Sequence, residues 1–166
     1  MNVYPIEAGN FKLDGGAMFG VVPKSLWTKT NPADADNMIE MSSRCMLVEN
    51  SDKLILVDTG MGDKQSEKFF KYYKRWGSDN LVKSINSAGF SIDDVTDVLL
   101  THLHFDHCGG AVAWNSSKEA YDVLFKNANY WSNEKHWDWA TNPNPREKAS
   151  FLDENLFPIK ESGKLK

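Results

Sequence analysis

Apolar runs alternate with polar turns in the first sixty residues, and this pattern predicts antiparallel strands. The runs cover residues 2–9, 17–22, 37–49 and 53–58. The turn-forming sequence Asp14-Gly15-Gly16 separates the first two runs, and Asn50-Ser51-Asp52 separates the last two. Two hairpins follow from this spacing, with residues 28–37 predicted to be a polar loop between them.

Helical patterns appear after residue 60 and alternate with shorter apolar runs. We predict helices over 64–76, 78–89, 132–140 and 146–155, and strands over 95–100, 122–127 and 128–131. Ser78 and Ser132 are the expected N-caps of their helices, and Gly77 and Gly89 are the expected stops. A strand–helix–strand order of this kind is typical of an α/β fold.

A cluster of polar side chains directly follows the predicted strand 95–100. The segment Thr101–Gly110 reads T-H-L-H-F-D-H-C-G-G and holds three of the four histidines of the chain. His102, His104 and Asp106 alternate, so an extended backbone directs them to one side, and a turn would bring His107 round from another direction. Imidazole and carboxylate are ligands for zinc, and also for iron or manganese.

Four donors in so short a segment exceed what one tetrahedral ion needs from it. We therefore predict two divalent metal ions, with zinc favoured: His102 and His104 hold one, and Asp106 and His107 hold the other. Two ions about 3.5–4 Å apart can share a hydroxide that acts as a nucleophile. The alternatives are a histidine-rich surface loop and a structural metal site, although a structural zinc usually has several cysteine ligands.

Three motifs in the same order resemble the metallo-β-lactamase superfamily. They are His102-x-His104-x-Asp106-His107 followed by Gly109-Gly110, the strand Leu54–Val57 ending in Asp58-Thr59-Gly60, and the opening stretch Gly15–Lys24. The last resembles the lactonase-like branch, which includes acyl-homoserine-lactone lactonases and some organophosphate hydrolases. The resemblance implies an αββα sandwich, of which this chain supplies about the N-terminal half.

The resemblance also implies roles for individual residues. Asp58 would support the metal-bearing loop from behind, and Asp106 would be both a metal ligand and the catalytic residue. The remaining donors in that superfamily are a further histidine, a bridging aspartate and a final histidine, and no histidine follows His136 here. We therefore expect residues 1–166 to be a single domain that is incomplete at its C-terminus.

The expected function is a metal-dependent hydrolase that uses a metal-bound hydroxide on an ester-like bond, with a lactone as the favoured substrate. Phosphotriester and thioester hydrolases share the motif, as do β-lactamases and di-iron oxidoreductases. The di-iron enzymes usually carry a glutamate in the motif, which argues against them. A non-catalytic metal-binding or interaction module with an incomplete site is the alternative from another class.

Composition narrows the expected partners. The net charge of −4 comes from interleaved acidic and basic residues, which argues against a nucleic-acid partner. No apolar run reaches the roughly 18 residues of a membrane span, and we identify no signal peptide. We expect a cytoplasmic protein that acts on a small molecule, and a homodimer is compatible with an uncovered sheet face.

Other candidate ligands are weaker. His136 lies on a predicted helix among tryptophans, so packing is the favoured explanation for it. Cys45 and Cys108 are the two cysteines, and a small buried thiol is common in protein cores. The aromatic residues near His136 are expected to pack in the core and not to line a substrate pocket.

Overall fold

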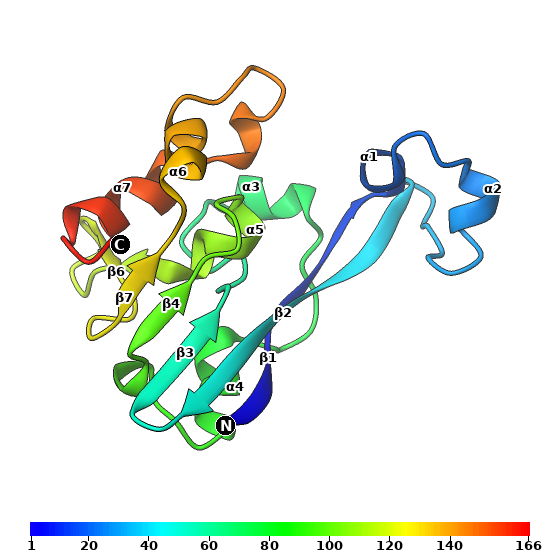
Figure 1. The fold of residues 1–166 in the computed structure, drawn as a ribbon. Helices are drawn as coiled ribbons and strands as arrows, with labels where there is room; N and C mark the ends of the chain where they lie inside the picture. Colours follow the sequence, from blue (N-terminus) through cyan, green and yellow to red (C-terminus); the bar gives the residue numbers. More distant parts are fainter.

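A five-stranded mixed sheet forms the centre of the computed structural model, which describes residues 1–166 (Figure 1). Its strand order is β1 (Asn2–Asp14), β2 (Met38–Asn50), β3 (Lys53–Val57), β4 (Asp97–Leu99) and β7 (Asn129–Trp131). The first three strands pair antiparallel, whereas β3, β4 and β7 are parallel. A separate two-stranded sheet pairs β5 (Val112–Trp114) with β6 (Tyr121–Val123).

Short helices connect these strands. They are α3 (Glu67–Tyr72), α4 (Leu81–Ser87), α5 (Phe105–Cys108), α6 (Glu134–Thr141) and α7 (Asp153–Glu161), with 3₁₀ turns η1 (Ile92–Asp94), η2 (Gly109–Ala111) and η3 (Lys148–Ser150). The predicted α/β class is confirmed. No helix is both long and apolar enough to span a membrane.

The two faces of the sheet differ in their burial. One cross-strand row, Tyr4-Leu47-Leu56-Val98-Tyr130, packs into the main core. The next row lies on the opposite face and consists of Pro5, Met46, Val57, Leu99 and Trp131. Met46, Leu99 and Trp131 remain 42%, 43% and 44% exposed. The sheet therefore has one covered face and one apolar face open to solvent.

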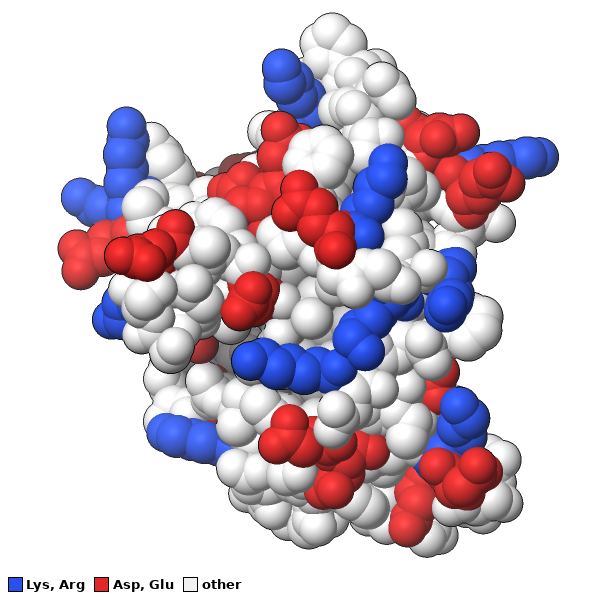
Figure 2. Space-filling view, turned by 90° about the vertical axis from the view of Figure 1, so that its left-hand side faces the viewer, with Lys and Arg blue, Asp and Glu red and all other residues white.

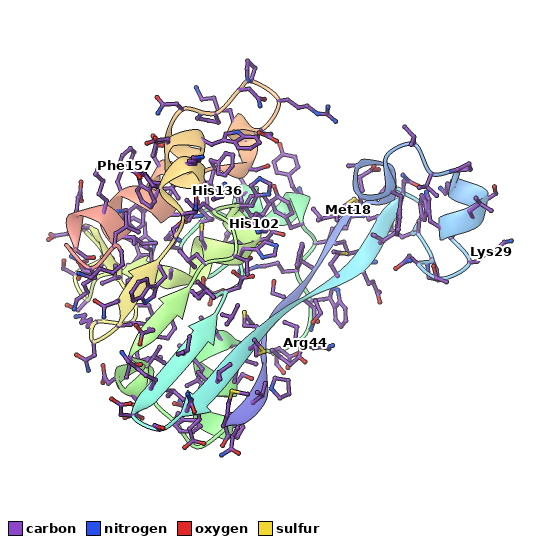
Figure 3. The ribbon with its side chains drawn as sticks, viewed as in Figure 1. Met18, Lys29, Arg44, His102, His136 and Phe157 are labelled. Carbon is purple, nitrogen blue, oxygen red and sulfur yellow. The ribbon has the colours of Figure 1, made fainter.

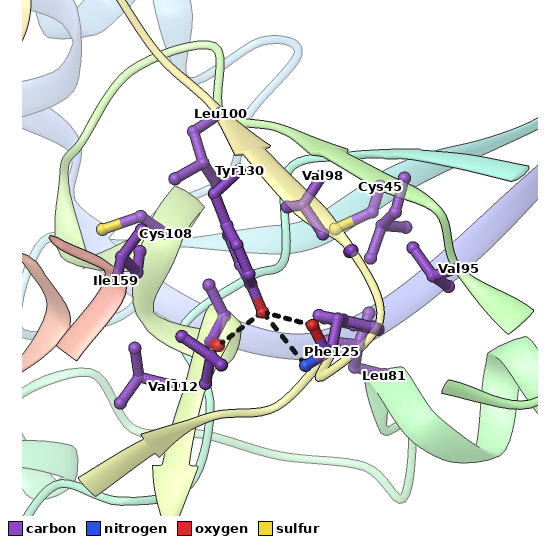
Figure 4. Close-up of a cluster of buried hydrophobic side chains, with 14 of the residues drawn as sticks. Cys45, Leu81, Val95, Val98, Leu100, Cys108, Val112, Phe125, Tyr130 and Ile159 are labelled. Atoms are coloured by element: carbon purple, nitrogen blue, oxygen red, sulfur yellow. Dashed lines mark hydrogen bonds between the residues drawn. The ribbon is translucent and has the colours of Figure 1, made fainter. Parts of the chain in front are cut away.

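Tyr130 is the largest fully buried side chain of the core. Its hydroxyl accepts the backbone N–H of Phe125 at 3.0 Å and lies 3.3 Å from the Phe125 carbonyl and 3.4 Å from that of Ala111 (Figure 4). A buried hydroxyl needs such partners, because an unpaired polar group in a core is costly. These contacts fasten the chain after β6 to η2, which directly follows the histidine motif.

The last residues of the chain continue the sheet beyond β7. Leu165 bridges Tyr130 in parallel, and Tyr130 N donates to Lys164 O at 2.9 Å. Lys166 N donates to Tyr130 O at 2.8 Å, and Ser132 N donates to Lys166 O at 3.2 Å. Residues 164–166 therefore run beside β7 in the same direction.

The hairpin of β1 and β2 extends beyond the rest of the sheet as an arm that carries α1 (Gly15–Phe19) and α2 (Lys24–Trp27) at its tip (Figure 1). The predicted strand 17–22 is therefore wrong. Asp14 caps α1 by accepting from Ala17 N at 2.7 Å, and Phe19 stacks on the buried Trp27 with ring centroids 5.0 Å apart. This tertiary contact outweighs the strand propensity of the segment.

Two predicted helices also need correction. The helix over 64–76 is shorter, because Ser66 caps α3 and the preceding Lys64 turns into the core. The helix predicted over 146–155 is replaced by η3 and by α7, which continues through Pro158 and buries Leu156 and Ile159. The remaining predicted strands of the main sheet are confirmed, with shifted ends.

Candidate metal centre

The histidine motif lies where two parallel strands end. β3 ends just before Asp58, and β4 ends just before Leu100 and Thr101. Because β3 and β4 are neighbours, their carboxyl ends meet at one edge, which is where open α/β sheets usually place ligands. The backbone N–H of Asp58 donates to Leu99 O at 2.9 Å and so links the ends of β3 and β4.

Three imidazoles meet at this edge. The ring centroid of His102 is 4.6 Å from that of His104 and 3.9 Å from that of His107. Asp106 completes the group, with its Oδ2 3.6 Å from Nε2 of His107. The four side chains singled out in the sequence thus come together although they leave the backbone in different directions.

Asp58 orients two of these rings. Its Oδ2 lies 2.9 Å from Nδ1 of His107, and both of its oxygens accept from the Thr101 hydroxyl, at 2.9 and 2.8 Å. The same hydroxyl lies 3.2 Å from Nδ1 of His102. A carboxylate can only accept, so the proton of His107 lies on Nδ1. Because the Thr101 hydroxyl donates its own proton to Asp58, it accepts the proton on Nδ1 of His102. In both rings Nε2 keeps its lone pair.

The backbone of Asp58 is held in an unfavourable conformation. Its φ angle of +60° lies in the left-handed region, which few non-glycine residues adopt. The side-chain Oδ1 of Asp58 also accepts the backbone N–H of Thr101 at 2.9 Å. Strain of this kind persists where surrounding contacts enforce it, and it is common at functional sites.

Electrostatics act in opposite directions on the two rings that Asp58 and Thr101 hold. Burial, followed by the nearby His107 and His104, lowers the pKa of His102. Burial alone would lower the pKa of His107, but the hydrogen bond to Asp58 and the charge of Asp106 raise it overall. Burial would raise the pKa of Asp58, yet bonds from His107 and Thr101 outweigh it and lower that pKa.

The loop after β3 is hydrogen-bonded to the backbone of the histidine motif and holds the motif in place. Thr59 N donates to His107 O at 2.8 Å, Gly110 N donates to Gly60 O at 2.9 Å, and the buried Lys64 donates to Gly109 O. A Cβ at Gly109 would lie 2.2 Å from Met61 O. Only glycine permits this approach between the two backbones.

Beside Asp106 and His107 lies a cavity of 140 Å³. Its lining comes from β1, β2 and the two loops: Phe11, Met41, Ser42, Ser43, Arg44, Cys45, Asp58, Gly60, Asp106 and His107.

Burial raises the pKa of Cys45 to about 12, and that of Cys108 likewise to about 12. Both thiols are buried in the main core, where a small thiol commonly packs.

His136 is close to the centre without belonging to the cluster (Figure 3). Its ring centroid is 6.5 Å from that of His102, and its Nε2 accepts the backbone N–H of Leu103 at 2.9 Å. Neither this contact nor the role of Thr101 follows from the sequence pattern. Thr101 directly precedes His102, which is the one signal that could have drawn attention to its hydroxyl.

The donor set fits a divalent metal in type but is incomplete in number. Imidazole Nε2 atoms and a carboxylate next to an ordering aspartate match the usual arrangement of histidine ligands. No group of three or more His, Cys, Asp or Glu side chains is arranged to hold an ion by itself. The segment thus offers donors for metal ions but no closed ligand set.

The model of the metallo-beta-lactamase superfamily matches residues 39–163. The chain belongs to this superfamily. Its fold is similar to that of a probable metal-dependent hydrolase from Staphylococcus aureus, with a TM-score of 0.89 and 31% identity, covering 99% of this chain and 57% of the other. The solved structure of a dizinc quorum-quenching lactonase is also similar, with a TM-score of 0.70 and 26% identity, covering 99% of this chain and 56% of the lactonase.

Curated relatives are similar over a shorter region. An N-acyl homoserine lactonase of Bacillus cereus is 28% identical over 104 residues, which are 57% of this chain and 40% of the lactonase. A probable metallo-hydrolase of Mycobacterium tuberculosis is 31% identical over 108 residues, 57% of this chain and 35% of its own. This chain spans little more than half the length of its structural neighbours.

Proposed function

We propose that the protein to which this chain belongs is a metal-dependent hydrolase that cleaves an ester-like bond, with a lactone as the first candidate. The observation that supports it best is the meeting of His102, His104 and His107 at one sheet edge, with Asp58 fixing ring protons away from the cluster. Among relatives, several are lactonases, and one solved lactonase is described as dizinc.

In this proposal the chain supplies four ligands for two divalent ions, with zinc favoured and iron or manganese as alternatives. His102 and His104 bind one ion, and Asp106 and His107 bind the other. Such ions polarise a carbonyl and lower the pKa of water to about 7 when they are bound. The remaining ligands would come from parts of the protein outside this chain.

The residues of the chain have separable roles. Asp58 and Thr101 hold the rings of His107 and His102 so that Nε2 of each points away from Asp58. Asp106 lines the 140 Å³ cavity, where its carboxylate can contact a substrate and accept a proton. We propose it as both ligand and catalytic residue.

The substrate would be a small molecule. Acidic and basic side chains are interspersed on the face shown in Figure 2, without a broad field of positive charge there. Phosphotriesters and thioesters remain alternatives to a lactone. A module that binds metal without catalysis is a further candidate, because no three donors close a ligand set within this chain.

Metal content and hydrolysis, measured on the full protein, test this proposal. We expect two ions per chain by elemental analysis, and turnover of a lactone that stops after exhaustive chelation and returns with zinc. The double variant His102→Ala/His104→Ala should lose metal and turnover, whereas Asp52→Ala in an exposed turn should retain both. Hydrolysis that survives chelation would refute a metal-dependent mechanism. Metal binding without hydrolysis of lactone, thioester or phosphotriester would favour the binding module.

A further inference from the structure

Leu103 separates two of the proposed ligands and is anchored at three points. Its side chain is fully buried in the main core. Its carbonyl accepts from Sγ of Cys108 at 3.3 Å, and its N–H donates to Nε2 of His136 at 2.9 Å. The loop between β4 and α5 has no regular ladder here, so the acceptor for this N–H has to come from elsewhere in the fold.

We infer that His136 is a positioning residue for the metal centre, since its ring accepts the N–H of Leu103 and so fixes the peptide unit that joins His102 to Leu103. The inference rests on the proposed metal site and adds a residue that the superfamily motif does not contain. It also gives His136 a function beyond packing among aromatic neighbours.

The geometry excludes His136 as a direct ligand in this arrangement. A neutral imidazole has one nitrogen lone pair, and here that lone pair is directed at the Leu103 N–H. The proton of the ring must then lie on Nδ1. His136 therefore acts on the ions through the backbone of the loop.

The surroundings hold the ring in place. Asn133 caps α6 and accepts from His136 N at 3.3 Å, which fixes the first turn of the helix. The His136 ring lies 5.9 Å from that of Phe151, and Phe151 in turn lies 4.8 Å from the ring of His104. Helix α6 and Phe151 thus hold the His136 ring next to the loop.

Three variants of the full protein separate positioning from general stability. His136→Leu removes the acceptor and keeps a similar volume, whereas His136→Gln places an amide oxygen near the position of Nε2. Ala140→Gly weakens the same helix at a buried residue and leaves the His136 acceptor in place. Zinc affinity is measured by competition with a chromophoric chelator, and amide exchange at Leu103 is measured in metal-free protein.

We expect His136→Leu to lose about 10–100-fold in zinc affinity, the usual effect of removing a group that orients ligands. Exchange at Leu103 should accelerate in the same variant. His136→Gln should restore much of both properties, and Ala140→Gly should lower the melting temperature while leaving zinc affinity nearly unchanged. Long-range ¹H–¹⁵N correlation should show the His136 proton on Nδ1 in metal-free wild type.

Different results would overturn the inference. Unchanged zinc affinity and unchanged amide exchange in His136→Leu would show that the hydrogen bond from Leu103 to His136 does not position the metal ligands. Equal losses in His136→Gln and His136→Leu would indicate that the imidazole itself is needed, and an equal loss in Ala140→Gly would indicate a general folding effect. If wild type binds none of zinc, iron and manganese, the proposed function fails, while the proton position and the exchange at Leu103 still decide whether the hydrogen bond from Leu103 to His136 exists.

Discussion

Single residues in this protein often serve two purposes. Asp58 is a turn residue with positive φ and also the acceptor that orders His107 and Thr101. Aspartate tolerates the left-handed region better than most residues because its short side chain can bond locally. A turn and an ordering carboxylate are therefore one feature here, which is why an aspartate suits the end of β3.

Asp97, on the open face of the sheet, also makes several contacts with one side chain. Its carboxylate accepts from Trp131 Nε1 at 2.7 Å, Thr96 Oγ1 at 2.8 Å and Lys53 Nζ at 3.0 Å. Burial alone would raise the pKa of Asp97, but these bonds outweigh it and lower that pKa. Three donors thus allow a charged group to sit within an otherwise apolar surface.

The lowered pKa of Asp97 predicts a pH effect on stability. The contribution of this group is fully present above the unfolded pKa of about 3.9 and is lost as pH falls through the lower folded value. Asp97→Asn should therefore flatten the acid limb of the free energy of unfolding, measured by urea titration at several pH values. Trp131→Phe, which removes one donor, should keep the limb but move it to higher pH. An unchanged acid limb in Asp97→Asn would contradict the assignment.

At the scale of elements, the site depends on two loops that touch through their backbones. The loop after β3 and the motif after β4 share bonds from Thr59, Gly110 and Lys64. Neither Gly109 nor Gly110 leaves room for a side chain, because a Cβ on either residue would lie 2.2 Å from a carbonyl oxygen of the facing loop. The glycine pair that ends the motif is thus explained by close approach.

Gly109→Ala should separate the two loops and destabilise the protein by at least about 1–3 kcal/mol, the usual cost of overpacking. The contact atoms belong to backbone, so they cannot move aside as a side-chain tip would. Thermal unfolding and zinc affinity are the measurements. Gly16→Ala is the control, because a Cβ there would meet only side-chain atoms of Asp14 and Asn37, at 3.0 and 3.6 Å. Equal stability of both variants would contradict the close approach.

Local patterns predicted the elements that depend on local signals. The hairpin of β2 and β3 and the helix that ends near Gly89 follow from alternation and stop residues. The strand predicted over 17–22 is wrong because Phe19 stacks on Trp27. The helix predicted over 146–155 is wrong because α7 packs its buried face against β5 and β6, which lie earlier in the chain. The same limit applies to the site: the motif and Asp58 are visible in the sequence, whereas the bonds of Thr101 and His136 exist only after folding.

At the scale of the molecule, the open apolar face is the largest departure from a self-contained fold. The row of Met46, Val57, Leu99 and Trp131 crosses four neighbouring strands. Exposed apolar patches of this kind mark surfaces that are covered by other chain or by another molecule. The resemblance to an αββα sandwich, together with 57% coverage of the Staphylococcus aureus neighbour, is consistent with such a cover.

The isolated 166-residue chain should therefore associate in a concentration-dependent manner. Leu99→Lys places a charge in the centre of the row and should shift sedimentation velocity profiles towards monomer. Met18→Lys changes an exposed residue at the tip of the arm, away from the sheet, and serves as the control. Association that persists in Leu99→Lys but disappears in Met18→Lys would place the contact on the arm instead.

The parallel pairing of residues 164–166 with β7 has a consequence for the path of the polypeptide. Neighbouring parallel strands end at the same edge of the sheet, and this edge already carries Asp58 after β3 and the histidine segment after β4. Residues 164–166 point towards the same edge, so four parallel segments direct their carboxyl ends to the proposed metal centre.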